Sequence, residues 1–249
     1  MGTSTGYTMP SGGEWAPLKT DVTEFAKQGG SKSPASILKG YLSAAGGRDG
    51  ISRGSGHGRG GGGGVGGRGS VIGTARSVGG FLNRVHAVGL DEALREIGLP
   101  HLIDKNASEI ASGLLDSLVG PASTLDEAAV RAALDDLNEE LLGDAETYED
   151  VERILTESVD SRGLVQIIGS FFGHYIYERF CRDFYERLVK RAGPSQAADS
   201  LDSIKDYVES SLRAKLVNRD ATKVNWRGAE GSRITGEILQ ETVEIFGAA

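Results

Sequence analysis

From residue 71 onward, apolar residues recur at spacings of three and four, which is the period of one face of an α-helix. Gly120-Pro121 and Gly193-Pro194 interrupt this pattern, and Thr124 and Glu127 have the spacing of a capping box that starts a helix. The pattern predicts a series of helices over residues 71–88, 91–97, 106–118, 124–142, 147–159, 164–191, 195–217 and 233–246.

The most apolar of these segments, residues 164–191, is predicted to be the central helix. Gly169 and Gly173 lie four residues apart on it and would let a second helix approach closely. Only a few short apolar runs suit β-strands. The predicted fold is therefore mainly α, a helical bundle preceded by a flexible N-terminal region rich in Gly, Ser and Arg.

The chain ahead of residue 71 has a different composition. Residues 1–19 are rich in Gly, Ser and Thr, so we expect a disordered tail in which Trp15 is a candidate partner contact. Two short helices are predicted within residues 20–45. Residues 46–70 are dominated by Gly, which has no side chain to bury and much backbone entropy to lose, so they predict a flexible linker. Residues 71–249 would then form the all-α domain.

Charge is divided unevenly along the chain. Residues 1–89 contain ten Lys or Arg against four Asp or Glu, whereas residues 90–249 contain 17 against 31, and together they give the net charge of −8. The basic front part is explained either by solubility or by contact with an acidic partner.

The cysteine count and the apolar segments indicate the cellular compartment of the protein. The single cysteine, Cys181, excludes a disulfide framework within the chain and favours a reducing compartment. The first residues have no apolar segment typical of a signal peptide, and the apolar run within residues 164–177 is too short and too polar to span a bilayer. We expect a cytoplasmic protein that does not associate with a membrane.

Residues with catalytic chemistry are sparse. The sequence has no Walker A loop and no HExxH motif, and its GxGxxG match falls in the polyglycine stretch with no strand before it. His174 and Cys181 share a helix face but are about 10.5 Å apart along it, which is too far for a direct hydrogen bond. We therefore predict no enzymatic activity, no cofactor and no metal, and a protein that acts by binding.

The arginines of the linker suggest an alternative function. Arg48, Arg53, Arg59 and Arg68 among glycines resemble an RGG segment, so an RGG-type nucleic-acid-binding adaptor is the alternative function. No aromatic residue lies between them to stack on a base, and nucleic acid is therefore not favoured.

A loop between the last two predicted helices contains Trp226 and Arg227 between small residues. Trp and Arg are enriched at the energetic centres of protein interfaces, so both are candidate partner contacts. They could equally close the end of the bundle, and the sequence leaves both interpretations open.

Met1-Gly2 has a chemical consequence. Gly is small enough for methionine aminopeptidase to remove Met1, which exposes the Gly2 amine. An α-amine has a pKa near 7.7–8.0, so part of it is neutral and nucleophilic at cellular pH. The myristoylation pattern needs Ser or Thr at position 6, where this chain has Gly6, so lipid is not the favoured modification.

The order of several motifs resembles a known family. The motifs are Met1-Gly2-Thr3-Ser4 with Tyr7 and Pro10, the Gly/Arg-rich stretch, Gly80-Phe81-Leu82, Val88-Gly89-Leu90-Asp91, Leu94, Gly98-Leu99, and Gly120-Pro121 before Thr124-Leu125-Asp126-Glu127-Ala128. Together they resemble the B-component family (QatB) of the four-gene Qat anti-phage defence systems. The chain departs from the family at Gly6-Tyr7-Thr8-Met9-Pro10, where we expect Tyr-Gly-Gly-Pro.

The resemblance implies a bacterial, non-catalytic subunit. Its implied partners are a P-loop ATPase, an enzyme similar to the synthase of 7-cyano-7-deazaguanine, and a TatD-like nuclease. It further implies that the synthase-like enzyme transfers a deazaguanine acyl group to the amine of Gly2, that Thr3, Ser4 and Tyr7 are recognised by this enzyme, and that residues 71–246 dock the ATPase.

Overall fold

The structure is a computed structural model that describes residues 9–27, 32–53 and 70–247. Within these residues the chain forms α-helices and one short 3₁₀ helix, η1, and no strand, which confirms the mainly α prediction. The elements are α1 Trp15–Ala26, α2 Pro34–Ala44, α3 Gly47–Arg53, α4 Val71–Val88, α5 Leu90–Glu96, η1 Pro100–Leu102, α6 Ala107–Leu118, α7 Leu125–Leu142, α8 Tyr148–Arg162, α9 Leu164–Ala192, α10 Pro194–Lys215 and α11 Ala229–Gly247.

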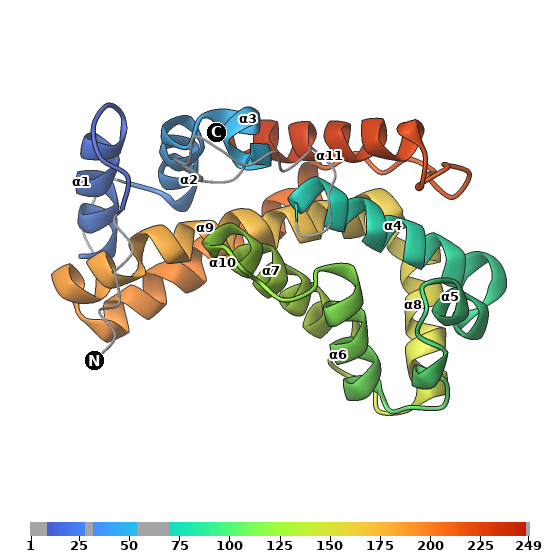
Figure 1. Cartoon of the computed structure of the whole chain (residues 1–249). Helices are drawn as coiled ribbons and strands as arrows, with labels where there is room; N and C mark the ends of the chain where they lie inside the picture. The colour runs from blue at the N-terminus through green and yellow to red at the C-terminus, as the bar shows by residue number, and fades with distance from the viewer. Residues whose placement is uncertain (1–8, 28–31, 54–69, 248–249) are drawn as a thin grey trace.

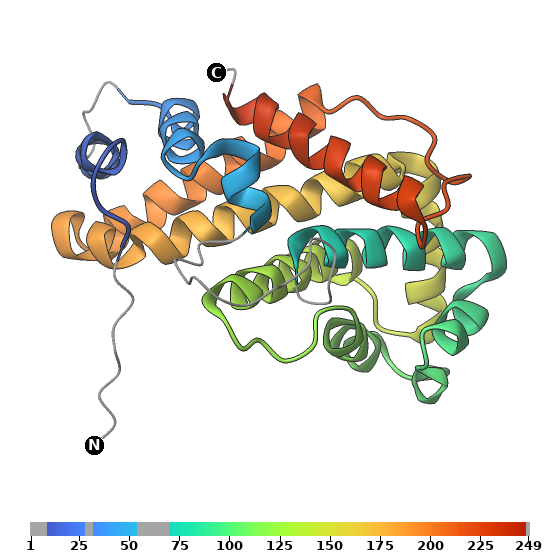
Figure 2. The ribbon, with the colours of Figure 1, turned by 45° about the horizontal axis from the view of Figure 1, so that its top comes forward.

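The predicted central helix, α9, runs through the middle of the molecule beside α10 (Figure 1). Helices α2 and α11 lie on one side of it and α7 on the other, as a second view also shows (Figure 2). The close approach predicted at its glycines is confirmed, because a Cβ on Gly169 would lie 2.2 Å from Leu216 Cδ2 and one on Gly173 would lie 2.5 Å from Leu212 Cδ1.

Local signals set many helix ends. The Thr124 side chain accepts a hydrogen bond from the backbone N–H of Glu127, and the Glu127 carboxylate accepts one from the backbone N–H of Thr124, which is the predicted capping box. Gly163 and Gly193 separate α8, α9 and α10 with φ angles of 79° and 91°. Those angles favour glycine, so the chain turns sharply at both positions.

The first helix corrects part of the predicted disordered tail over residues 1–19, because residues 15–19 are helical. Helix α1 begins at Trp15, whose ring stacks on Phe184 with ring centroids 6.3 Å apart, and Leu18 is buried in the same core. This burial against a distant helix stabilises a turn that the local sequence does not favour. Pro17 is tolerated because it lies in the first turn, where its missing N–H has no helical partner to lose.

Helix α3 corrects part of the predicted flexible linker. Gly47–Arg53 is helical although it lies within residues 46–70. Ile51 is fully buried, and Arg179 of α9 donates hydrogen bonds to the carbonyl oxygens of Gly50 and Ile51 at 3.1 and 3.3 Å. These tertiary contacts offset the entropy cost of ordering glycine. Residues 54–69 of the predicted linker lie outside the described residues.

The N-terminal helices belong to the same core as the rest of the bundle. Helix α1 packs on α9 and α10, α2 packs on α10 and α11, and α3 packs on α11. One continuous cluster of buried apolar residues extends from Leu18 to Phe246. The structure therefore has no boundary between residues 20–45 and the helices that follow residue 71. Within the described ranges, no helix has the length and apolar character needed to cross a bilayer.

Candidate functional site

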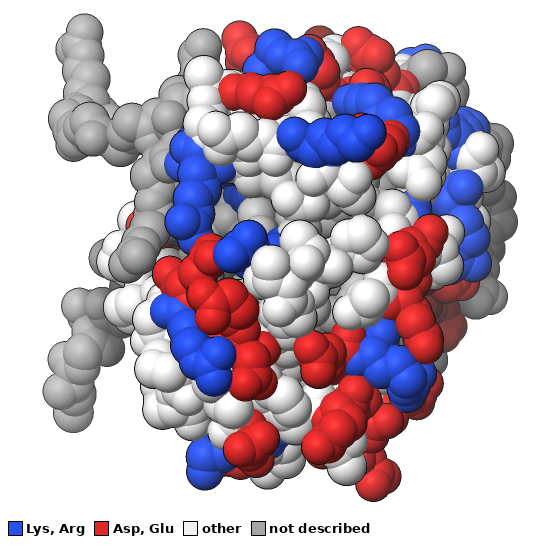
Figure 3. Space-filling view, turned by 90° about the vertical axis from the view of Figure 1, so that its right-hand side faces the viewer, with Lys and Arg blue, Asp and Glu red and all other residues white. Residues whose placement is uncertain are grey.

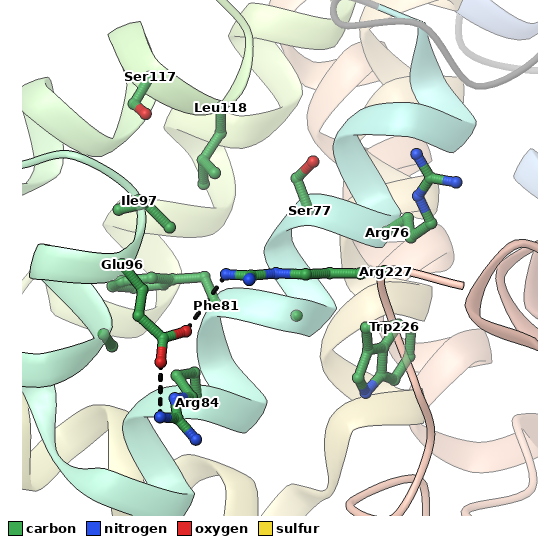
Figure 4. Close-up of a pocket in the computed structure, with 12 residues that line it drawn as sticks. Arg76, Ser77, Phe81, Arg84, Glu96, Ile97, Ser117, Leu118, Trp226 and Arg227 are labelled. Carbon is green, nitrogen blue, oxygen red and sulfur yellow. Dashed lines mark hydrogen bonds and ion pairs between the residues drawn. The ribbon is translucent and has the colours of Figure 1, made fainter.

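A cleft of about 330 Å³ lies where α4, α5 and the end of α6 meet the loop before α11. It contains both residues of the predicted Trp–Arg loop (Figure 4). The twelve lining residues are Arg76, Ser77, Gly80, Phe81, Arg84, Ala93, Glu96, Ile97, Ser117, Leu118, Trp226 and Arg227.

Trp226 is an interior residue of this region. Its side chain is only 3% exposed, and its indole Nε1 donates a hydrogen bond to the carbonyl oxygen of Ala221 at 3.2 Å. It fits against α4 because Gly79 has no side chain there: a Cβ on Gly79 would lie 2.7 Å from Trp226 Cζ3. Of the two interpretations of Trp226, the geometry favours packing within the bundle over contact with a partner.

Arg227 has the opposite environment. Its side chain is 75% exposed, and its Nη2 meets Glu96 Oε2 at 3.2 Å. Arg84 of α4 meets the other oxygen of the same carboxylate, Oε1, at 2.5 Å. Figure 4 shows Arg227 extended across the cleft toward Glu96, with Arg84 reaching the carboxylate from α4. Glu96 therefore joins the loop to the helix pair α4–α5.

The cleft holds more positive than negative charge. Arg76, Arg84 and Arg227 line the cleft together with one carboxylate, that of Glu96, and Arg84 and Arg227 contact it. Arg76 Nη1 donates a hydrogen bond to Ser232 Oγ at 2.8 Å. The Nε of Arg84 is buried and has no hydrogen-bond partner among the described residues. Guanidinium groups in such an arrangement bind oxyanions, above all carboxylates and phosphates.

Arg76, Arg84 and Glu96 were not among the site residues predicted from the sequence. Arg76 and Arg84 are eight residues apart on the polar side of a helix, which is the only signal that the sequence offers for them. The contact that completes the site joins Arg227 to a residue 131 positions away in the chain. No local pattern encodes such a contact.

A buried polar network lies at the C-terminal end of α3. Tyr175 OH donates to Asp126 Oδ1 at 2.8 Å, and Tyr41 OH donates to Asp183 Oδ2 at 2.9 Å. Burial, reinforced by Asp183, raises the pKa of Tyr41 well above its ordinary value. With Arg179, which donates to the carbonyl oxygens of Gly50 and Ile51, this network holds α3 against α9.

The two residues weighed as a thiol–imidazole pair have separate surroundings. His174 is buried, and its Nε2 lies 2.9 Å from Glu140 Oε2 on α7. Burial raises the pKa of the Cys181 thiol to about 12. A thiol with that pKa stays protonated at neutral pH and is a poor nucleophile. Within the described ranges, no group of three or more His, Cys, Asp and Glu side chains is placed to hold a metal ion.

The remaining predicted residues concern the tail. Gly2, Thr3, Ser4 and Tyr7 lie outside the described residues. The chain after them is held to the bundle: Lys19 Nζ donates to the carbonyl oxygen of Pro10 at 2.7 Å, and Met9 packs partly buried against the core.

Trp15, the candidate partner contact of the tail, is half-buried against Tyr41 and Phe184. Much of its ring surface therefore packs within the molecule and is not available to a partner.

Comparison with known proteins identifies the family. No curated protein and no solved structure matched the chain. Residues 60–246 match the family described as Qat anti-phage system associated protein QatB, and this range covers most of the chain, including the cleft and the helices from α4 to α11. The chain therefore belongs to the QatB family and is a component of a Qat anti-phage defence system.

Proposed function

We propose that this chain is a non-catalytic subunit of its Qat system and that it has two separate functional parts. The N-terminal tail presents the Gly2 amine to the deazaguanine-synthase-like enzyme, and the helical body docks the P-loop ATPase. A TatD-like nuclease completes the system, which acts in the cytoplasm. Membership of the QatB family is the observation that carries this proposal.

The modification is an acyl transfer. The synthase-like enzyme activates 7-carboxy-7-deazaguanine as its adenylate, and the neutral Gly2 amine attacks the activated carbonyl carbon. A C–N amide bond forms, the C–O bond to AMP breaks, and the amine loses a proton. The ordinary pKa of an α-amine, near 7.7–8.0, leaves part of the Gly2 amine neutral at cellular pH.

The anchored start of the body limits where this chemistry takes place. Gly2 lies seven residues before Met9, and a fully extended chain spans at most about 3.6 Å per residue. The amine therefore reaches no more than about 25 Å from Met9. Helices α1 and the end of α9 are where the modifying enzyme meets the body, at the opposite end of the molecule from the cleft (Figure 1).

One structural feature weakens the nucleic-acid-binding alternative. Arg48, one of the four arginines counted toward an RGG segment, lies in α3. A Cβ on Gly236 of α11 would lie 3.1 Å from its guanidinium Nη2, so the Arg48 side chain is packed against α11. This arginine is exposed, but it lies in a helix rather than in a flexible RGG segment.

The test is to purify the protein from cells with and without the gene of the synthase-like enzyme, and to measure the mass of the intact protein and of its N-terminal peptide. We expect loss of Met1 and an added mass on Gly2 that requires this enzyme. Replacing Gly2 by Glu blocks removal of Met1 and abolishes the addition, whereas the matched change Gly6→Ala leaves the acceptor intact and retains it. An unmodified Gly2 amine in the presence of all partners would overturn the acceptor role.

A further inference from the structure

The cleft is a positively charged site on an acidic body. Residues 71–249, which include all the residues of the cleft, carry 19 Lys or Arg against 31 Asp or Glu. On the face formed by the end of the bundle near α5 and α8, acidic side chains dominate the lower half, and basic side chains gather mainly in the upper half (Figure 3). Three arginines, Arg76, Arg84 and Arg227, line the cleft beside a single carboxylate, that of Glu96, which runs against the net negative charge of the domain. Such a local excess marks where a negatively charged group would bind.

Glu96 shows that the cleft can hold a carboxylate. Arg84 and Arg227 each meet a different oxygen of Glu96, so two guanidinium groups converge on one carboxyl group. The pair formed by Arg227 is exposed to solvent, and exposed pairs contribute little to stability. Arg227 can therefore exchange Glu96 for another carboxylate at small cost, while Arg84 keeps Glu96 in place.

We propose that this arginine cleft binds the carboxylate side chains of an acidic segment of a protein partner. Arg227 is the contact at the rim, and the apolar side chains of Ile97 and Leu118 receive the aliphatic part of the segment. The inference rests on the proposed docking role of the helical body and is independent of Gly2.

The position of the charges favours a protein over a small anion. Small-molecule sites bury most of their ligand, whereas Arg227 stands at the open rim with 75% of its side chain exposed. A small anion held there would stay in water, which weakens its attraction to the guanidinium group. A protein partner brings its own surface, which excludes water around the central contact.

Nucleic acid fits the cleft less well. Single-stranded nucleic acid is bound by tracking a long basic groove and by stacking bases on exposed aromatic rings. The two aromatic residues of the cleft, Phe81 and Trp226, are buried, with exposures of 4% and 3%. The acidic half of the surrounding face would repel a long chain of phosphates.

The test uses the full chain and a fluorescent hexaglutamate peptide, with binding followed by fluorescence anisotropy at low and high salt. We expect saturable binding that weakens at high salt. Arg227→Glu should lower the affinity by about tenfold or more, because a charge-assisted contact becomes a repulsion. The matched control is Arg233→Glu, which reverses an exposed, ion-paired arginine on α11 outside the cleft and should change the affinity by no more than about twofold.

Four results would overturn the proposal. They are no binding of hexaglutamate, equal loss in both variants, displacement of the peptide by equimolar inorganic phosphate, and tighter binding of a single-stranded DNA oligonucleotide that Arg227→Glu abolishes. The last two would identify a small-anion site and a nucleic-acid site. The mass of the N-terminal peptide is measured separately, so failure of the Gly2 proposal is distinguishable from failure of this one.

Discussion

Replacing Gly231 by Ala tests how the loop that carries Trp226 and Arg227 is held. Gly231 lies in the first turn of α11, and a Cβ there would lie 2.4 Å from the backbone oxygen of Trp226 and 2.6 Å from its Cα. Both contacts are with backbone atoms, so no side-chain rotation relieves them. The loop must move, and Trp226 would lose part of its packing against α4.

The magnitude follows from two opposing effects. Ala is favoured over Gly in a helix by about 1 kcal/mol, and by less in the first turn. Overpacking costs about 1–3 kcal/mol, and complete loss of a buried Trp side chain costs about 3–5 kcal/mol. The cost of overpacking therefore exceeds the gain in helix propensity, and we expect Gly231→Ala to lower the free energy of unfolding by about 2 kcal/mol.

Gly236 on the same helix is the matched control. A Cβ there meets only the guanidinium Nη2 of Arg48, at 3.1 Å, which is the far end of a flexible side chain. Helix propensity then decides, and Gly236→Ala should be neutral or stabilising by up to about 1 kcal/mol.

The assay is thermal unfolding followed by circular dichroism. For a chain of this size 1 kcal/mol corresponds to about 2–4 °C in Tm, so we expect Gly231→Ala to lower Tm by about 4–8 °C. The Gly236→Ala protein should unfold at the same temperature as the parent or up to about 4 °C above it. Equal shifts in the two variants would refute the assignment of Gly231 to a backbone contact with the Trp226 loop.

Three further changes test other features. Burial and the neighbouring Asp136 raise the pKa of Glu178, so its ionisation costs folding free energy, and the cost is complete above the folded-state pKa. Glu178→Gln should therefore raise Tm at pH 7, and the gain should shrink as the pH falls through the folded-state pKa and disappear below the ordinary pKa of Glu. Cys181, whose pKa is raised to about 12, should react with a thiol reagent at pH 8 only after the protein is unfolded, and fast labelling of the native protein would contradict its burial. Arg227→Ala should change the unfolding free energy by less than about 0.5 kcal/mol, because the ion pair that it removes is exposed, and a larger loss in urea unfolding would show that the loop depends on it.

The helices from α4 onward were predictable because their signals are local. Thr124 and Glu127 cap each other three residues apart, and Gly193 permits a turn that other residues resist. The resemblance to the QatB family also came from the order of short motifs along the chain, and the family match confirmed it. Each of these features is contained within a few neighbouring residues, so the sequence alone determined the all-α bundle, most of its helix boundaries and the family.

The features that the sequence did not predict depend on residues far apart in the chain. Helix α1 begins at Trp15 because Phe184 of α9 packs on its ring, and α3 is ordered because Arg179 binds its carbonyl groups. The cleft exists because Arg227 reaches Glu96 across 131 positions, and Trp226 is buried because Gly79 leaves space for it on α4. Local propensities are weak compared with burial and charge pairing between elements, so only the tertiary structure decided where the first helix begins and which arginines meet Glu96.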